Sequence, residues 1–226
     1  MPEVKPKRAF EAVIFDMDGT LADTFPTVVR IFNQLAAERT GREMSLEDLL
    51  PYFGPPETEI FKHFFPGEEE HRLVVEEFYR LSRADGQAIK PFAGIGELLA
   101  ELRQDGLRLA VYTGASTEAG RIRLGHAGLL DFFDEVLGGD QVANYKPHPE
   151  GIIKLVERFG LEPRAAMFVG DTTADIAAGR GAGTAVAAVT WGAGKREALA
   201  AAGPDYLIDD PETLRAIMSQ GLGVRD

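Results

Sequence analysis

Several features are missing from this chain of 226 residues, and each absence excludes a kind of site or a class of protein. There is no cysteine, which excludes disulfide bonds and thiolate metal sites. There is no apolar run of about 18 residues or more, so a membrane-spanning helix is not expected. Basic residues are scarce, since 24 Lys and Arg stand against 36 Asp and Glu, a formal charge of −12. This balance argues against nucleic-acid binding, which requires clustered Lys and Arg.

The first residues carry a short basic run, and the apolar stretch behind it ends at Asp16. That stretch is too short for the apolar region of a signal peptide. Hydrophobic residues make up 45% of the chain and charged residues 27%, which is ordinary for a globular protein. We therefore expect a cytoplasmic protein with a small-molecule partner, no membrane and no nucleic acid.

Apolar runs typical of strands alternate with helical patterns along most of the chain. This alternation predicts an α/β fold in which helices cover a mostly parallel sheet. Helices are predicted around residues 95–105 and 150–159, each ended by a glycine, and from Asp210 onwards. Strands are predicted over residues 12–15, 107–112, 135–137, 165–169, 184–189 and 205–208.

The segment from about Asp23 to Lys90 interrupts the alternation, because it contains helical stripes and no convincing strand. We interpret it as a helical insertion between the first strand and the rest of the sheet. Its two ends, near Ala22 and Lys90-Pro91, are the expected hinges. Four helices are predicted in it: a first one ending near residue 41, and others over residues 45–50, 57–65 and 68–84.

Chemically suggestive residues follow three of the predicted strands. Asp16 and Asp18 follow the first, Thr113-Gly114 the second and Asp171 the fourth. Sites in parallel sheets form at the carboxyl ends of the strands, so these residues are expected to converge. Alternate residues of a strand point the same way, so Asp16 and Asp18 are expected to share a side. Two such carboxylates repel each other unless a cation or a shared proton lies between them.

These residues, in order along the chain, resemble the four motifs of the haloacid dehalogenase superfamily. The motifs are Asp16-x-Asp18-Gly19-Thr20, Thr113, Lys146-Pro147 and Gly170-Asp171-Thr172-x-x-Asp175. The branch that the chain resembles most is that of the phosphoglycolate phosphatases and beta-phosphoglucomutases. The resemblance implies a Rossmann-like parallel sheet core over residues 1–22 and 91–226, with a helical cap domain over residues 23–90.

The resemblance also implies the chemistry of the carboxylates. Asp16 would be the nucleophile that forms an aspartyl-phosphate, and Asp18 the general acid and base. The ligands of Mg²⁺ would be the Asp16 side chain, the Asp18 backbone carbonyl and the Asp171 side chain, with Asp175 as a ligand or a support. Alternatively, Asp171 and Asp175 only cap the helix that follows them.

Phosphoryl oxygens would be bound by the Thr113 hydroxyl, the Gly114 N–H and the Lys146 ammonium. The family often has Asn where Gly114 stands, so a side-chain contact is absent there. The loop from Tyr52 to Pro56, with Gly54 at its centre, is the candidate for substrate contact from the insertion. Three cationic residues of the insertion are candidates for contact with an acidic leaving group, but for each we prefer the interpretation of a solvated helix surface: Lys62, His63 and Arg80.

The resulting prediction is a Mg²⁺-dependent phosphatase that acts on a small phosphorylated metabolite, with phosphoglycolate as the leading candidate. A phosphosugar mutase and a pyrophosphatase of the same superfamily are the enzymatic alternatives. A regulatory binding protein on the same scaffold is the alternative outside enzymes. The sequence leaves open whether the protein is a monomer or a homodimer.

Overall fold

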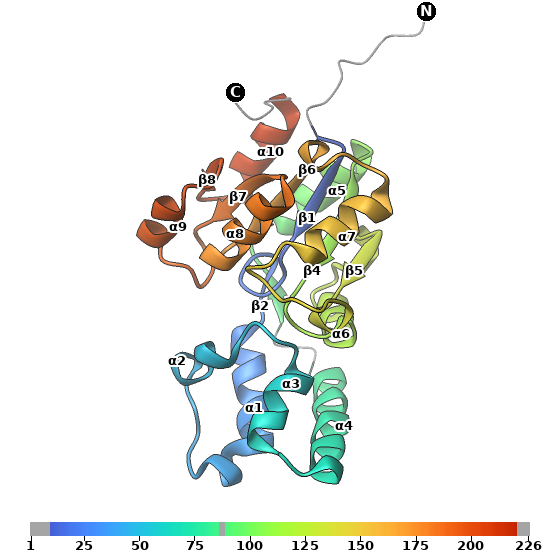
Figure 1. Cartoon of the computed structure of the whole chain (residues 1–226). Helices are drawn as coiled ribbons and strands as arrows, with labels where there is room; N and C mark the ends of the chain where they lie inside the picture. Colours follow the sequence, from blue (N-terminus) through green and yellow to red (C-terminus); the bar gives the residue numbers. More distant parts are fainter. Residues whose placement is uncertain (1–9, 86–88, 221–226) are drawn as a thin grey trace, which may run out of the picture.

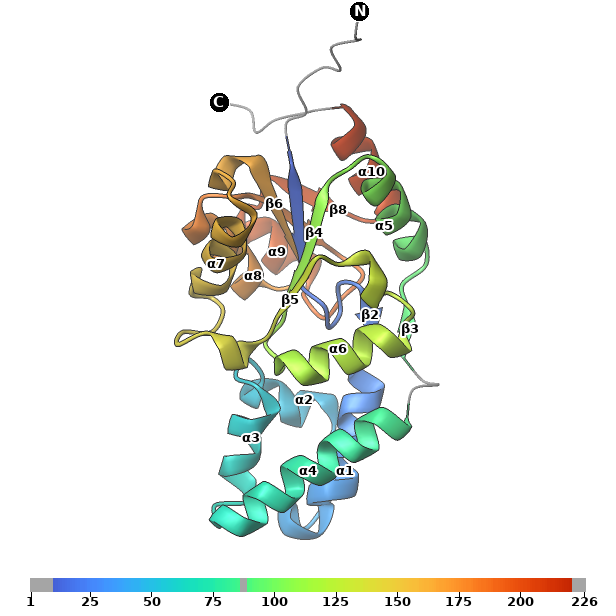
Figure 2. The same ribbon diagram turned by 90° about the vertical axis from the view of Figure 1, so that its right-hand side faces the viewer.

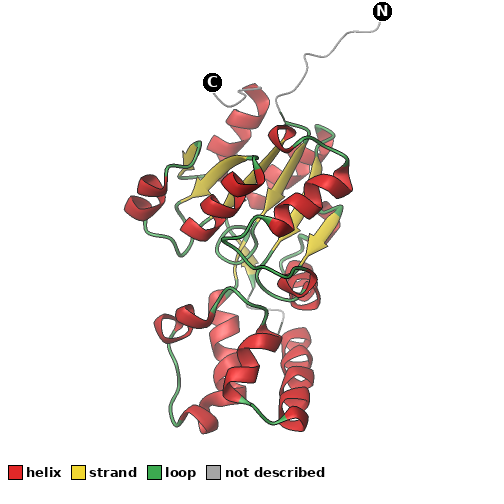
Figure 3. Ribbon diagram, in the orientation of Figure 1, coloured by secondary structure: helices red, strands yellow, loops and turns green. Residues whose placement is uncertain are grey.

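The computed structural model describes residues 10–85 and 89–220. Within them, six parallel strands form a central sheet in the order β5-β4-β1-β6-β7-β8. Figure 3 draws the strands in yellow among the red helices. The strands of this sheet are β1 (Ala12–Phe15), β4 (Arg108–Tyr112), β5 (Glu135–Leu137), β6 (Ala166–Gly170), β7 (Ala185–Val189) and β8 (Tyr206–Ile208). The α/β fold is confirmed, and each predicted strand is present to within one residue at either end.

The strand order explains where a site can form. The chain leaves β1 for β4 and β5 on one side and then returns to place β6 on the other side of β1. Loops that follow β1 and β6 therefore lead away in opposite directions. They leave between them the crevice in which doubly wound sheets bind ligands.

Helices cover both faces of the sheet (Figures 1 and 2). On one side lie α5 (Ile95–Gln104) and α10 (Pro211–Gln220), and on the other α7 (Glu150–Phe159) and α8 (Thr173–Ala182), beside which α9 (Arg196–Ala202) packs. Successive residues of β1 alternate between the two apolar layers: Val13 and Phe15 belong to the first, Ala12 and Ile14 to the second. A strand buried on both faces explains the continuous apolar run in the sequence.

The remaining elements of the sheet domain connect strands to helices. The helix α6 (Thr117–His126) follows β4 and lies between the sheet and the insertion (Figure 2). In the described part of this domain, short 3-10 helices complete the connections: η3 (Leu130–Phe132), η4 (Gly139–Gln141) and η5 (Pro163–Ala165).

We call residues 25–84 the helical insertion. It consists of α1 (Phe25–Thr40), α2 (Leu46–Leu49), the 3-10 helix η1 (Leu50–Tyr52), α3 (Glu57–Phe64) and α4 (Glu68–Ala84) (Figure 1). Ile31, Phe32, Leu49, Phe61 and Phe78 form the centre of its own apolar core. Across residues 10–85 and 89–220, no helix has the length and apolarity that a membrane crossing requires.

The two ends of the insertion are joined by a pair of very short strands. β2 (Ala22–Asp23) and β3 (Lys90–Pro91) pair antiparallel, with Ala22 opposite Pro91. The expectation that this segment contains no strand is therefore wrong at its two ends. Two residues cannot show a period of two, so the pattern gives no warning of such a pair. The predicted domain boundaries fall on this pair, and the division into two domains stays a prediction.

Candidate active site

The residues predicted to converge lie together at the carboxyl end of the sheet. Asp16 continues β1, where its N–H donates to the carbonyl of Val169 at 2.8 Å. Thr113 continues β4, where its N–H donates to the carbonyl of Leu137 at 3.1 Å. Asp171 follows β6, the neighbour of β1. Strand pairing thus fixes the backbone from which each of these side chains departs.

Lys146 joins two of the carboxylates. Its Nζ lies 2.5 Å from Asp16 Oδ1 and 2.8 Å from Asp175 Oδ1, and its side chain is 12% exposed. The rings of Tyr112 and Phe168 lie beneath the ammonium, with centroids 5.4 and 5.9 Å from Nζ. Burial alone would lower the pKa of Lys146, but the charges of Asp16 and Asp175 raise it overall. The ammonium therefore stays charged at neutral pH.

Asp16 is held in a dry environment, with only 5% of the residue exposed. Burial raises the pKa of Asp16 well above its ordinary value, and the nearby carboxylates of Asp175 and Asp171 add to the rise. Lys146 opposes them. Burial is the largest cause of this rise, so a further positive charge beside Asp16 would favour its ionised form.

Asp171 is fixed by three neighbours. Its Oδ1 accepts from the hydroxyl of Thr20 at 3.2 Å, and its Oδ2 accepts from the N–H of Ala193 at 2.7 Å. Gly19 has φ +88°, and a Cβ there would lie 2.5 Å from Asp171 Oδ2, so this turn requires glycine. Burial, followed by the charge of Asp175, raises the pKa of Asp171 to about 6.

The two carboxylate oxygens of Asp175 have different roles, one in capping a helix and one in the site. Oδ2 accepts from the N–H of Thr172 at 3.0 Å, while the Thr172 hydroxyl accepts from the N–H of Asp175 at 3.2 Å. This capping box begins α8. The capping alternative is therefore correct for Oδ2, whereas Oδ1 faces Lys146.

Asp18 lies apart from these three carboxylates and has partners of its own. Its oxygens contact Nη1 of Arg123 at 3.0 and 3.1 Å, and they accept from the hydroxyls of Thr24 and Thr113. Thr113 was expected to donate to a phosphoryl oxygen. Here its hydroxyl donates to Asp18 at 3.3 Å and accepts from the N–H of Ala115 at 3.1 Å. A phosphoryl contact would require that hydroxyl to leave Asp18.

The described residues contain one group of acidic side chains that can hold a metal ion. Asp16, Asp171 and Asp175 each offer an oxygen, and these oxygens lie within 4.8 Å of one another. Together with Asp18 they make four carboxylates, against two cations, Lys146 and Arg123. The difference of two negative charges and the oxygen-only donor set suit a hard divalent cation.

Gly54 and Gly114 meet where the insertion touches the core. Both line the cavity beside the acid cluster, and a Cβ on Gly114 would lie 2.8 Å from the carbonyl oxygen of Gly54. The room that an Asn side chain would need at position 114 is therefore taken by the loop of the insertion. Tyr52, at the other end of the predicted loop, instead packs against His63 and Phe64.

Some site residues were not predicted from the sequence. Arg123 is the most important, because it contacts the predicted acid and base directly. A second group joins the insertion to the core: Glu57 Oε2 accepts from the N–H of Ser116 at 3.0 Å, and Tyr79 donates to Glu57 Oε1 at 2.9 Å. The sequence gives only a weak indication of Arg123, because Arg121 stands two residues away in the same helix. Only the orientation of that helix distinguishes the two arginines.

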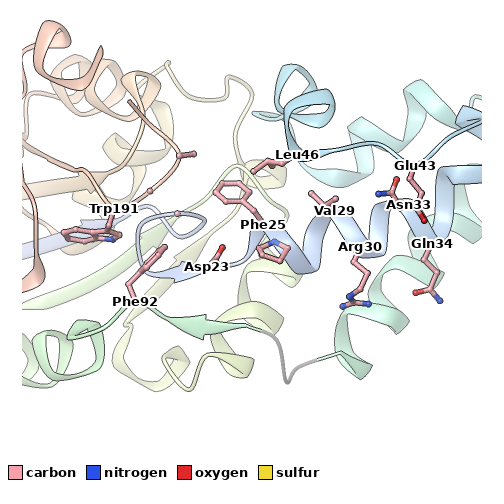
Figure 4. Close-up of a pocket in the computed structure, with 14 residues that line it drawn as sticks. Asp23, Phe25, Val29, Arg30, Asn33, Gln34, Glu43, Leu46, Phe92 and Trp191 are labelled. Carbon is pink, nitrogen blue, oxygen red and sulfur yellow. The ribbon is translucent and has the colours of Figure 1, made fainter. Parts of the chain in front are cut away.

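Two cavities lie between the insertion and the core. The one that contains Asp16, Asp18, Lys146 and Asp171 has a volume of about 320 Å³. A larger one, of about 780 Å³, runs along α1 from Trp191 and Phe92 towards Glu43 (Figure 4). Phe25 and Ala193 line both. None of the four motif carboxylates lines the larger cavity, so we place the candidate active site in the smaller one.

Fold and site together define a class of protein. It is a doubly wound α/β protein with a buried acidic cluster and one lysine in the crevice between the loops that follow β1 and β6. Residues 13–189 match the family model of the haloacid dehalogenase-like hydrolases, and the chain belongs to this family. It is 30% identical to the pyrophosphatase PpaX of Bacillus cereus over 207 residues, 92% of this chain and 95% of that protein.

Two solved structures extend the comparison. A Haemophilus somnus protein described as a predicted phosphoglycolate phosphatase has a TM-score of 0.81 and 26% identity, covering 92% of this chain and 98% of that one. A Thermotoga maritima protein assigned as a beta-phosphoglucomutase has a TM-score of 0.72 and 27% identity, covering 94% and 100%. The resemblance seen in the motifs is confirmed, whereas these relatives differ in the reactions that their names state.

Proposed function

We propose that this protein is a Mg²⁺-dependent phosphatase that hydrolyses a small phosphomonoester through an aspartyl-phosphate on Asp16. The observation that carries the proposal is the buried Asp16 carboxylate with Lys146 Nζ at 2.5 Å, in a cavity that Asp18 also lines. Membership of the hydrolase family supports it. The descriptions of the named relatives all refer to enzymes of phosphorylated substrates, two of them as predicted activities.

The reaction follows from the roles of two carboxylates. An oxygen of Asp16 attacks the phosphorus, the bond from phosphorus to the ester oxygen breaks, and Asp18 gives its proton to the departing alkoxide. Asp18 then takes a proton from water as that water attacks the phosphorus of the aspartyl-phosphate. Inorganic phosphate leaves, Asp16 is free again and Asp18 is protonated for the next cycle.

The other residues of the site neutralise negative charge and position the reacting groups. Lys146 places a positive charge beside Asp16, where the phosphoryl oxygens arrive. Gly114 lines the same cavity, and its N–H is the candidate backbone donor. Arg123, Thr24 and Thr113 hold the Asp18 carboxylate in one orientation. Geometry of this kind is what proton transfer requires.

The cluster fits a magnesium ion, because it is an all-oxygen site with an excess of two negative charges. Asp16 and Asp171 would hold it through their side chains and Asp18 through its backbone carbonyl, as the resemblance implies. Asp175 would support them through Lys146, or bind directly. When bound, the ion would neutralise charge on the transferring phosphoryl group.

Phosphoglycolate, pyrophosphate and sugar phosphates stay candidate substrates, and the resemblance ranks phosphoglycolate first. A mutase would use Asp16 and Asp18 in the same way but return the phosphoryl group to its substrate. A small metabolite as partner, a cytoplasmic location and a monomeric or homodimeric state also stay predictions. A regulatory protein without activity is disfavoured by the presence of all four carboxylates and Lys146.

The test is a panel of metabolite phosphates, including these three classes, incubated with the purified protein and Mg²⁺. We expect free phosphate in proportion to the substrate consumed, which separates hydrolysis from a mutase reaction. Activity should disappear with a chelator and return with added Mg²⁺. Equal rates with and without the chelator would contradict the metal assignment, and consumption without free phosphate would favour the mutase.

A further inference from the structure

The cavity beside the acid cluster has two walls of different chemistry. The core contributes the charged residues already described, whereas the helical insertion contributes a mainly apolar wall. Two stacked ring pairs make up much of that wall. Phe25 lies against Phe53 with centroids 6.2 Å apart, and Phe32 against Phe61 with centroids 5.9 Å apart. Val28 and Ile60 line the cavity with them.

Among the described residues that line this cavity, the insertion contributes no cation, and its one ionisable side chain there is Glu57. Both oxygens of that carboxylate already have donors, since Oε2 accepts from the Ser116 N–H and Oε1 from the Tyr79 hydroxyl. Glu57 thus ties the insertion to the core rather than reaching for a substrate.

The cations of the core are also matched. Lys146 contacts Asp16 and Asp175, and Arg123 contacts Asp18. A leaving group that carried a carboxylate or a second phosphate would therefore have to break one of these pairs or stay unpaired. With Mg²⁺ bound as proposed, the four carboxylates are balanced by the ion, Lys146 and Arg123, so no positive charge is left over for a second anionic group.

The cationic candidates from the sequence lie elsewhere. Lys62 contacts Glu59 at 2.6 Å, Arg80 contacts Glu77 at 2.7 Å, and both pairs are exposed on the surface. His63 packs against Tyr52. None of the three lines the cavity in the described structure, so none can meet the leaving group there.

We infer that the group that leaves is an apolar alcohol, aryl or branched alkyl, which packs against the phenylalanines of the insertion. The inference rests on the proposed phosphatase function and names its substrate class. The volume of about 320 Å³ is at the small end of ligand cavities, which suits a compact group of ring size. Each methylene group that the apolar wall takes out of water should raise kcat/KM by up to about fourfold.

The sharpest test is a pair of substrates that differ in one charge. Benzyl phosphate and 4-carboxybenzyl phosphate have the same ring and similar alcohols, but only the second carries a carboxylate. We expect kcat/KM for benzyl phosphate to exceed that for 4-carboxybenzyl phosphate and for phosphoglycolate by about tenfold or more. Phosphate release at saturating Mg²⁺ gives all three values.

A variant can reverse this preference. Ile60→Lys places an ammonium in the apolar wall, so it should lower kcat/KM for benzyl phosphate and raise it for 4-carboxybenzyl phosphate. Leu73→Lys is the matched control, because Leu73 is a 50% exposed residue of α4 that does not line the cavity. The control should keep the wild-type ratio. Circular dichroism and thermal unfolding establish that both variants fold; if Ile60→Lys does not, Val28→Lys replaces it.

The outcomes separate this inference from the proposed function. Phosphate release that is equal or faster with the carboxylated substrates would overturn the apolar leaving group and leave the phosphatase intact. An unchanged ratio in a folded Ile60→Lys variant would also overturn it. Failure to release phosphate from any ester of the panel would instead overturn the phosphatase.

Discussion

At the scale of single residues, the account depends on which neighbour each carboxylate has. Asp16 and Asp18 are two residues apart in the chain, yet Lys146 contacts the first and Arg123 the second. Their environments therefore differ, which is what two different roles in one reaction require. The proposed division of labour between nucleophile and acid–base group has its physical basis in these different neighbours.

Arg123 is expected to act by positioning Asp18. Arg123→Met should lower kcat by at least about tenfold with little change in KM, because proton transfer depends on orientation. The loss should be larger for an alkyl phosphate than for 4-nitrophenyl phosphate, whose leaving group needs little protonation. Arg123→Lys should restore part of the rate. Steady-state kinetics on both esters provides the measurement.

Arg121→Met is the matched control for that variant, since Arg121 lies exposed on the same helix. It should leave both substrates unaffected. An equal loss on the two esters in Arg123→Met, with unchanged thermal stability, would show that Arg123 does not serve the acid–base step.

Several site residues could be predicted because they stand next to strands. Asp16, Thr113 and Asp171 follow apolar runs, and the parallel sheet brings the ends of those runs together. Lys146 was found only through its motif. Arg123 could not be predicted, because α6 carries arginines at positions 121 and 123 and the packing of the helix selects between them.

At the scale of elements, the strands and helices follow closely from periodicity and glycine stops. The α1 helix ends at Gly41 and α7 at Gly160, each glycine having a left-handed conformation. The docking of the insertion does not follow in the same way. An apolar stripe looks the same in sequence whether its residues form the core or a cavity wall. Ile31, in the core of the insertion, therefore cannot be told from Phe25, in the wall of the cavity.

The contact between the loop at Gly54 and the turn at Gly114 offers a test at this scale. Gly114→Ala places a Cβ at 2.8 Å from the Gly54 carbonyl oxygen, so the loop over the cavity must move away. We expect KM to rise about three- to tenfold, because that loop forms part of the cavity wall. Michaelis–Menten kinetics and thermal unfolding together detect the effect.

Gly125→Ala is the control for this substitution, since nothing lies within 4 Å of a Cβ at that position of α6. It should keep the wild-type KM and stabilise the helix by roughly 0.5–1 kcal/mol. A Gly114→Ala variant with the KM of Gly125→Ala would mean that the loop does not shape the substrate site.

At the scale of the whole molecule, we expect the acid cluster to link the stability of the fold to pH and to the binding of Mg²⁺. The pKa of Asp171 is raised from its ordinary value near 3.8 to about 6, with burial as the main cause. Between these values the folded protein binds the proton more tightly than the unfolded chain does. The stability that Asp171 contributes is therefore fully present below about 3.8, and it is lost as the pH rises through about 6.

Mg²⁺ should reverse that loss, because its ligands must be deprotonated and the ion stabilises the folded state by mass action. At a hundredfold excess over its Kd we expect a gain of about 2.7 kcal/mol near neutral pH, or a rise in Tm of about 5–10 °C. The gain should shrink at about pH 5. Calorimetry of wild type and Asp171→Asn gives the comparison; the same gain in the variant, or at both pH values, would refute the link.

The central claim, a phosphoryl group carried by Asp16, can be tested by trapping it. The protein is mixed with Mg²⁺ and a turned-over phosphate ester, quenched in acid within the first turnover, digested and examined by mass spectrometry. The account predicts a phosphoryl adduct on the peptide at Asp16, with neither adduct nor phosphate release in a folded Asp16→Asn variant. An adduct on another residue, or undiminished hydrolysis by Asp16→Asn, would contradict it.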